Sequence, residues 1–400
     1  MKKCIKIGIR NNLLYPMIMI ISTLCRQIDS KVMNKVIEFN GGSLLLTQLM
    51  FLSEFIFGLI LFNYNKKLMS KQKTNDEKIM FMGIKLNPKK AEISLADGSL
   101  KIYIFIFLVA YFDFIEFVLK EFYLPHLSVF NSVKLSKSLD LRLRGILVIS
   151  SALFCYFLLK FPAYKHKKVS LLIIVISLVL VIISEYFREL NNIKVLTYYL
   201  VLSFFNHFFN SYKDIIEKYL LEYNYLNPFK ILMIEGIFGF LMAFCYTFIN
   251  GQPLKEYNEI NILKNNKNGN IKVFYLVICF FFYFIFSGGK NIYRVLTNKF
   301  FSPTTKSLGD SLLDSFLIIF YYFDGDFINH KIHFIINVIL SFIFIFCACI
   351  YNELFVLFCF NLQHDTYIEI TKRSIKNESL FELAGDYDFN NDEEISGKLY

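Results

Sequence analysis

Charged and amide side chains recur at helical spacing inside apolar segments of this sequence, and together they could bind a polar solute. Asn206, Asn210, Lys213 and Glu217 follow one another at i, i+4, i+7 and i+11, on one face of a helix. A second face has Ser287, Asn291, Arg294 and Asn298, with Lys290 beside it, and a third has Ser307, Asp310, Ser311 and Asp314. Such faces are buried only against one another, which predicts a polar, wet centre in a helix bundle.

Within this centre we expect Arg144 and either Lys290 or Arg294 to supply positive charge, with Asp310 and Asp113 holding or balancing it. An arginine can bind a carboxylate or phosphate through two parallel hydrogen bonds, which lysine cannot reproduce. Ser151, Glu116 and Glu54 are further polar residues of the apolar segments. The aspartates are candidates for carrying a coupling proton.

Each of these residues has a structural alternative, an ion pair or hydrogen bond that only holds helices together. The alternative is as strong as function for the i−4 pair of Lys213 and Glu217, and it is favoured for Glu54 and Glu235, which sit near span ends or in helix-contact motifs. For Arg144, Lys290, Arg294 and Asp310 we favour the solute site.

Enzyme chemistry finds little support in the motifs. His330 and His333 lack a third metal ligand, and Glu185 with Arg188 completes no intramembrane protease pattern. No H-E-x-x-H, P-loop or G-x-S-x-G motif occurs. We therefore expect no catalytic activity, no cofactor and no metal.

The elements that carry these residues are typical of a membrane protein. Apolar residues make up 55% of the 400, above the roughly 45–50% of soluble chains, and they form long blocks between short charged loops. The net charge of +10 comes from loop lysines, which indicates contacts with lipid headgroups rather than nucleic acid.

Blocks of about 20 apolar residues, the length that spans a bilayer, predict an all-α integral membrane fold of about ten transmembrane helices. The predicted spans are 12–27, 44–64, 101–123, 141–161, 169–187, 196–221, 229–250, 271–292, 304–323 and 332–351. The first follows Lys2, Lys3, Lys6 and Arg10, as a signal peptide does, but no small-x-small cleavage site comes after it. We therefore favour a retained helix.

Lysine and arginine gather in the N-terminus, the Lys-rich loop 65–100, the loop 160–168 and the start of the polar tail 361–400. The positive-inside rule then places both termini in the cytosol, which requires an even number of spans. Low hydrophobicity predicts that the tail is disordered.

A weak internal sequence repeat divides the membrane region into two halves, 1–187 and 188–360. SKSLDLRLRGIL, from Ser136, leads into the fourth span, and TKSLGDSLLDSFL, from Thr305, lies at the start of the ninth. A repeated unit of five spans must be inverted in the membrane, which is the architecture of alternating-access carriers. Coincidence in a sequence of biased composition is the alternative.

The chain also resembles the drug/metabolite transporter superfamily, most closely its nucleotide-sugar-transporter-like branch, solute carrier family 35, subfamily F. The residues that carry the resemblance are Glu217-Lys218 before Pro228, Glu235-Gly236-x-Phe238-Gly239, and Pro303-Thr304-Thr305 before Asp310-Ser311-Leu312. It implies ten helices in two inverted halves around a cavity for an organic solute, and a membrane of an intracellular organelle. Leu313 and Asp314 stand where the family usually has a basic residue, which argues against a strongly anionic nucleotide sugar.

The resulting prediction is a secondary-active transporter, an exchanger or gradient-driven carrier of a small organic solute. The alternative is a non-transporting receptor or scaffold. The sequence leaves the oligomeric state open, a homodimer included.

Overall fold

The structure is a computed structural model that describes residues 14–37, 44–72, 80–81, 84–85, 100–119, 143–161, 164–188, 193–224, 226–249, 269–311 and 331–355, with Thr366, Glu369 and Arg373. Asp314, His330, the N-terminus, most of the loop 65–100 and most of the tail 361–400 lie outside these residues. The expectations about signal cleavage, loops and tail disorder fall there as well.

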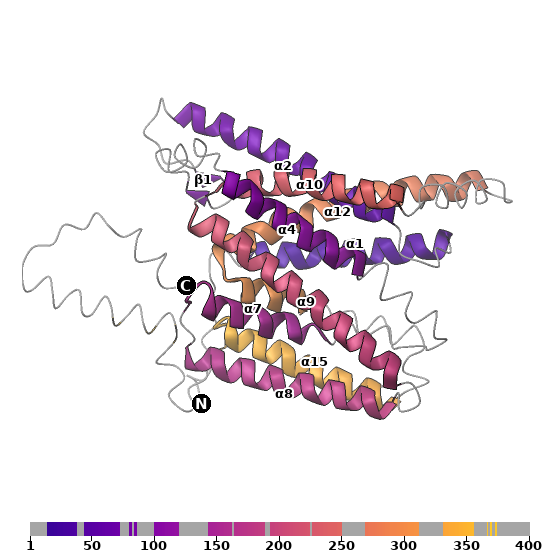
Figure 1. Ribbon diagram of the computed structural model, residues 1–400, viewed down its shortest axis with the longest axis vertical. Helices are drawn as coiled ribbons and strands as arrows, with labels where there is room; N and C mark the ends of the chain where they lie inside the picture. Colours follow the sequence, from indigo (N-terminus) through magenta and orange to yellow (C-terminus); the bar gives the residue numbers. More distant parts are fainter. Residues whose placement is uncertain are drawn as a thin grey trace, which may run out of the picture. The chain divides into compact units, whose positions relative to one another are not determined.

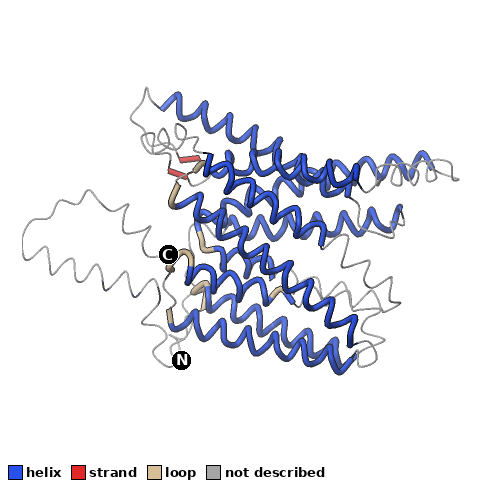
Figure 2. Tube along the Cα trace, viewed as in Figure 1, coloured by secondary structure: helices blue, strands red, loops and turns tan. Residues whose placement is uncertain are grey.

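Helices build almost all of the described chain (Figures 1 and 2). They are α1 (Leu14–Ile37), α2 (Leu44–Gln72), α4 (Leu100–Val118), α7 (Gly145–Phe157), α8 (Lys165–Arg188), α9 (Ile193–Glu222), α10 (Pro228–Ile249), α12 (Gly269–Phe300) and α15 (Lys331–Tyr351). A further helical stretch covers residues 303–311. The strands β1 (Met80–Phe81) and β2 (Ile84–Lys85) form one short antiparallel pair. The all-α prediction is confirmed apart from this pair.

Each predicted span coincides with helical residues, the ninth through 303–311 only. Among the described residues, four helices are long and apolar enough to cross a membrane: Leu45–Lys67, Lys165–Phe187, Pro228–Ile249 and Ile271–Phe300. Shorter apolar helices cover Gly145–Phe157 and Val338–Tyr351. The membrane-like helical character is therefore established for the described residues.

Local chemistry explains where several helices begin and end. α10 starts at Pro228, where the missing N–H costs nothing, and Asn227 Oδ1 accepts a hydrogen bond from the Phe229 N–H at 2.9 Å. Pro303 likewise begins the next helical stretch, and Ser302 Oγ accepts a hydrogen bond from the Thr305 N–H at 3.2 Å.

The ends of α7 and α15 share a different device. Lys160 (φ 56°) and Glu353 (φ 58°) adopt the left-handed conformation just after the two helices. The Phe161 N–H then donates to Cys155 O at 3.0 Å, and the Leu354 N–H to Cys349 O at 2.9 Å. These bonds satisfy carbonyls that the last helical turn leaves open.

The helices form two compact units that interleave along the sequence. Unit 1 comprises α7, α8, residues 303–311 and α15, and unit 2 comprises α1, α2, α4, α9, α10 and α12. Each unit draws helices from both predicted halves.

Unit 1 is held together by α8 and α15, which run side by side (Figure 1). Between these helices, Ser170 Oγ donates a hydrogen bond to Cys347 O at 2.6 Å. Ile174 and Leu308 belong to one apolar cluster with Cys347. The outer face of α8 is apolar: Leu172, Ile176 and Leu180 are 50–59% exposed. Large apolar side chains outside and hydroxyls inside suit a lipid environment.

Unit 2 contains the pair α2 and α10, which also lie alongside each other (Figure 1), and the pair α1 and α12. Two apolar clusters fill it, one around Leu220, Leu232 and Leu296 and one around Phe51 and Tyr283. Charged residues lie among these clusters in the interior, and they form the candidate site.

Candidate functional site

Glycines bring the backbones of α2 and α10 together and so position two buried glutamates. A Cβ atom on Gly236 would lie 2.4 Å from the backbone N of Phe55, and one on Gly58 would lie 2.7 Å from the backbone N of Met233. Only glycine fits such an approach, as in small-residue contacts between membrane helices. Glu54 and Glu235, each next in sequence to a contact residue, are both 0% exposed.

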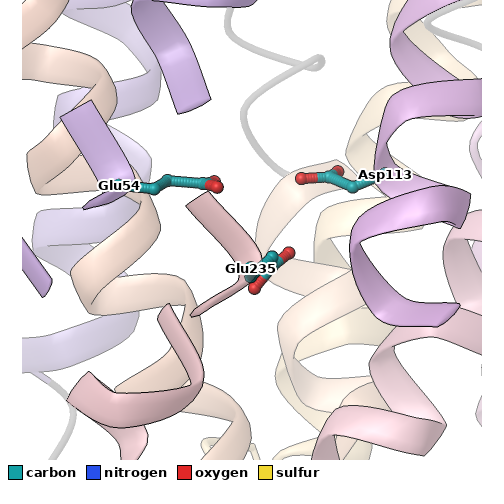
Figure 3. Close-up of side chains that lie close together, drawn as sticks. All are labelled: Glu54, Asp113 and Glu235. Carbon is teal, nitrogen blue, oxygen red and sulfur yellow. The ribbon is translucent and has the colours of Figure 1, made fainter. Parts of the chain in front are cut away.

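Arg294 of α12 is the cation that three carboxylates share. Its Nη2 donates to Oε1 and Oε2 of Glu235, both at 2.9 Å, while Nη1 lies 3.8 Å from Oδ2 of Asp113. Oε1 of Glu54 lies 4.0 Å from Nη2 of Arg294, outside hydrogen-bond range. The carboxylates approach a common space from α2, α4 and α10 (Figure 3).

A second cation, Lys213 of α9, compensates the far side of Asp113. Its Nζ lies 2.5 Å from Oδ1 of Asp113 and 3.4 Å from Oε2 of Glu116. Asn298 then joins α12 to α9, because its Nδ2 donates to the Glu217 carboxylate at 2.9 Å. Five helices, α2, α4, α9, α10 and α12, therefore contribute to one buried network of charges.

Polar atoms without a partner lie on the same faces of α9 and α12. Oδ1 of Asn206, Oδ1 of Asn210, Oγ of Ser287 and Nδ2 of Asn291 are buried and have no hydrogen-bond partner among the described residues. An unsatisfied buried polar group costs about 1–3 kcal/mol. These atoms therefore have capacity to bind water or a polar solute.

Unit 1 contains polar contacts between the start of the fourth predicted span and the start of the ninth. Nη1 of Arg144 donates to the backbone O of Asp310 at 3.4 Å, and the Ser151 and Ser307 hydroxyls lie 2.8 Å apart. Lys306 Nζ approaches Oδ2 of Asp310 at 3.0 Å. The residue numbers rise on α7 as they fall on 303–311, so the two helices pack antiparallel.

The predicted site residues thus fall into two sets. Unit 2 brings Asp113, Lys213 and Arg294 into contact, with Lys290 half-buried and close enough for its charge to act on Asp113. Asn206 and Asn210 lie on α9 with Lys213, and Asn291 lies on α12 with Arg294. In unit 1, Arg144 contacts Asp310. Asp314 lies outside the described residues.

Several residues of these networks are outside the predicted binding residues, among them Glu54, Glu235 and Lys306. The sequence favours a structural role for Glu54 and Glu235, and it assigns no role to Lys306. The i,i+4 spacing of Lys306 and Asp310 was an available signal. For Glu54 and Glu235, the signal was the neighbouring glycine or aromatic contact motif in each helix.

Glu54, Asp113 and Glu235 also have the ligand spacing of a metal site, with carboxylate oxygens within 4.8 Å of one another. The guanidinium of Arg294 lies 2.9 Å from Glu235, 3.8 Å from Asp113 and 4.0 Å from Glu54. A permanent positive charge at that position repels a metal cation, so this donor set does not fit a metal.

Comparison with known proteins adds no family: no family model and no curated protein matches the chain.

Proposed function

We propose that the chain is a secondary-active transporter, an exchanger or gradient-driven carrier of a small organic solute. The observation that carries this proposal is the row of unpartnered polar atoms on α9 and α12, beside a buried network of charges. A charged side chain inside a membrane costs several kcal/mol, and such residues commonly mark a solute or ion pathway. Asn206, Asn210, Ser287 and Asn291 are the proposed solute contacts in unit 2.

The proposed architecture is ten spans in two inverted halves. The protein would lie in the membrane of an intracellular organelle, with both termini on the cytosolic side. Two observations support the repeat. Unit 1 draws the fourth, fifth, ninth and tenth predicted spans, which are equivalent pairs in the two halves. The fourth and ninth pack antiparallel, as inverted copies do. We propose membership of the drug/metabolite transporter superfamily on the motifs quoted above.

A non-transporting receptor or scaffold is the second candidate. It is favoured by two ion pairs within unit 2, one between Arg294 and Glu235 and one between Lys213 and Asp113. Such pairs can serve only to hold helices together. The unpartnered amides are the feature that this alternative leaves without a role.

Uptake by purified protein in liposomes tests the proposal. The screen covers nucleotide sugars, phosphorylated sugars, amino acids and drug-like cations, with empty liposomes as the baseline. For a solute that enters, Asn210→Leu should abolish uptake, whereas Thr197→Val, at an exposed position of the same helix, should leave it intact. Folded protein that moves no compound of any class would favour the scaffold.

A further inference from the structure

We propose that Glu54 is a proton-binding site, whose carboxyl group takes up and releases the proton that couples to solute movement. The coupling role rests on the proposed transport function, whereas proton binding itself does not. Glu54 is 0% exposed on α2, and neither of its carboxylate oxygens has a hydrogen-bond partner among the described residues. Its side chain points into the space that it shares with Asp113 and Glu235 (Figure 3).

The charges that act on Glu54 come from four packed helices. They are Glu235 on α10, Asp113 on α4, Arg294 on α12 and Lys213 on α9. Further charged groups surround this inner set. Glu116 contacts Lys213, the charge of Lys290 acts on Asp113, and the charge of Glu217 acts on Arg294. On α1, Arg26 contacts Met50, which lies one turn before Glu54.

The inner set contains three carboxylates and two cations, so one carboxylate lacks a counter-charge. Glu235 has both short hydrogen bonds of Nη2, and Asp113 has Lys213 at 2.5 Å. Glu54 is left with a contact of 4.0 Å to an arginine that is already engaged. An isolated ionised carboxylate is strongly disfavoured in an apolar interior, so a proton is the charge that Glu54 can accept.

Proton release changes the competition for Arg294. The O–H bond of the Glu54 carboxylic acid breaks, the proton passes to water or to a solute group, and the electron pair stays on the carboxylate. The new anion attracts Arg294, whose Nε has no acceptor among the described residues. Arg294 lies one turn from the proposed solute contact Asn291 on the same face of α12, which links proton release to the solute site.

Infrared titration of the purified full-length chain tests proton binding without any solute. The carbonyl region should contain a band of a protonated carboxyl that is lost only at a pH above the range of exposed carboxyls, which titrate near about pH 4. Glu54→Gln should remove this titrating band. Glu185→Gln, at an equally buried glutamate of α8, should retain it.

Each outcome decides the proposal. A titrating band that persists in Glu54→Gln, or no titrating band in the wild type, overturns it. Should Glu54→Gln fail to fold, Glu54→Asp replaces it, and a band whose frequency does not shift in that variant also overturns the assignment. A band lost only in Glu54→Gln supports it.

Coupling is measured separately in liposomes, with a solute found by the uptake screen. Wild-type protein should accumulate that solute under an imposed pH gradient, and Glu54→Gln should exchange it without responding to the gradient. Wild-type uptake that ignores the gradient overturns coupling. Absence of all uptake with an intact infrared band overturns the transport proposal and leaves proton binding standing.

Discussion

Nη2 of Arg294 donates hydrogen bonds to both carboxylate oxygens of Glu235 at 2.9 Å, and the two side chains are 2% and 0% exposed. This pair joins α12 to α10 in the interior of unit 2. Because Asp113 and Glu54 also approach the same guanidinium, the pair is the centre of the network rather than an isolated contact.

Removal of one member of this pair should destabilise the protein strongly. Arg294→Gln leaves a buried carboxylate without its cation, a change that costs about 3–5 kcal/mol. The double variant Arg294→Gln/Glu235→Gln should recover part of this loss, as thermal unfolding in detergent can measure. Arg26→Gln, whose parent side chain donates to the Met50 sulphur, should cost less. Equal losses in the single and double variants would show that the two residues are not coupled.

Gly236→Ala should separate α2 from α10. The new Cβ would lie 2.4 Å from the backbone N of Phe55 and 2.8 Å from the backbone O of Phe51, so the backbones must move. Overpacking of this kind costs about 1–3 kcal/mol, readable as a lower unfolding temperature. Gly145→Ala is the matched control, because its Cβ would meet the Leu178 side chain at an ordinary 3.4 Å. A Gly236→Ala protein as stable as wild type would contradict the close contact.

Arg144→Lys tests whether Arg144 serves the solute. Uptake per folded molecule should fall about tenfold or more, because a hydrogen bond to a charged group contributes about 1.5–3 kcal/mol. Expression and delivery should be unchanged. A merely structural Arg144 predicts the reverse, lower expression with normal transport by the remaining protein. Wild-type uptake in both Arg144→Lys and Arg294→Lys would remove both arginines from the site.

Cysteine cross-linking should report the antiparallel packing of α7 on residues 303–311. Ser151→Cys/Ser307→Cys should form a disulfide under mild oxidation, since the parent hydroxyls lie 2.8 Å apart. The variant is made with Cys155→Ser, because Cys155 lies near Thr304 and could form a competing disulfide. Peptide mapping then identifies the bond. Ser150→Cys/Ser307→Cys, displaced by one position around the helix, should cross-link far less. Equal cross-linking in the two variants would argue against this register.

Topology is testable by tags in two segments rich in polar residues. Protease sites or glycosylation acceptors introduced at Asn75 and Asn390 should report the same, cytosolic side, because the lysine distribution places both there. Accessibility from opposite sides would contradict the predicted topology, which has eight spans between the two tags.

The sequence by itself determined the class of fold and the helix positions. Apolar blocks of bilayer length force the backbone to satisfy its hydrogen bonds within helices, so helices were predictable from 44–64 or 229–250 alone. Local signals also placed some boundaries, such as Asn227-Pro228 at the start of α10. Helical spacing likewise predicted that Asn210 and Lys213 share a face.

Only the tertiary structure decided which charges meet. Spacing along a helix cannot tell that Arg294 pairs with Glu235, 59 residues earlier, or that Lys213 pairs with Asp113, 100 residues earlier. Nor could it assign Glu54 to the network, because Glu54 is the single acidic residue of 44–64 and has no charged partner at helical spacing within that segment. The glycine contact between α2 and α10 brings these residues together, and a contact between distant segments arises from packing rather than from local sequence.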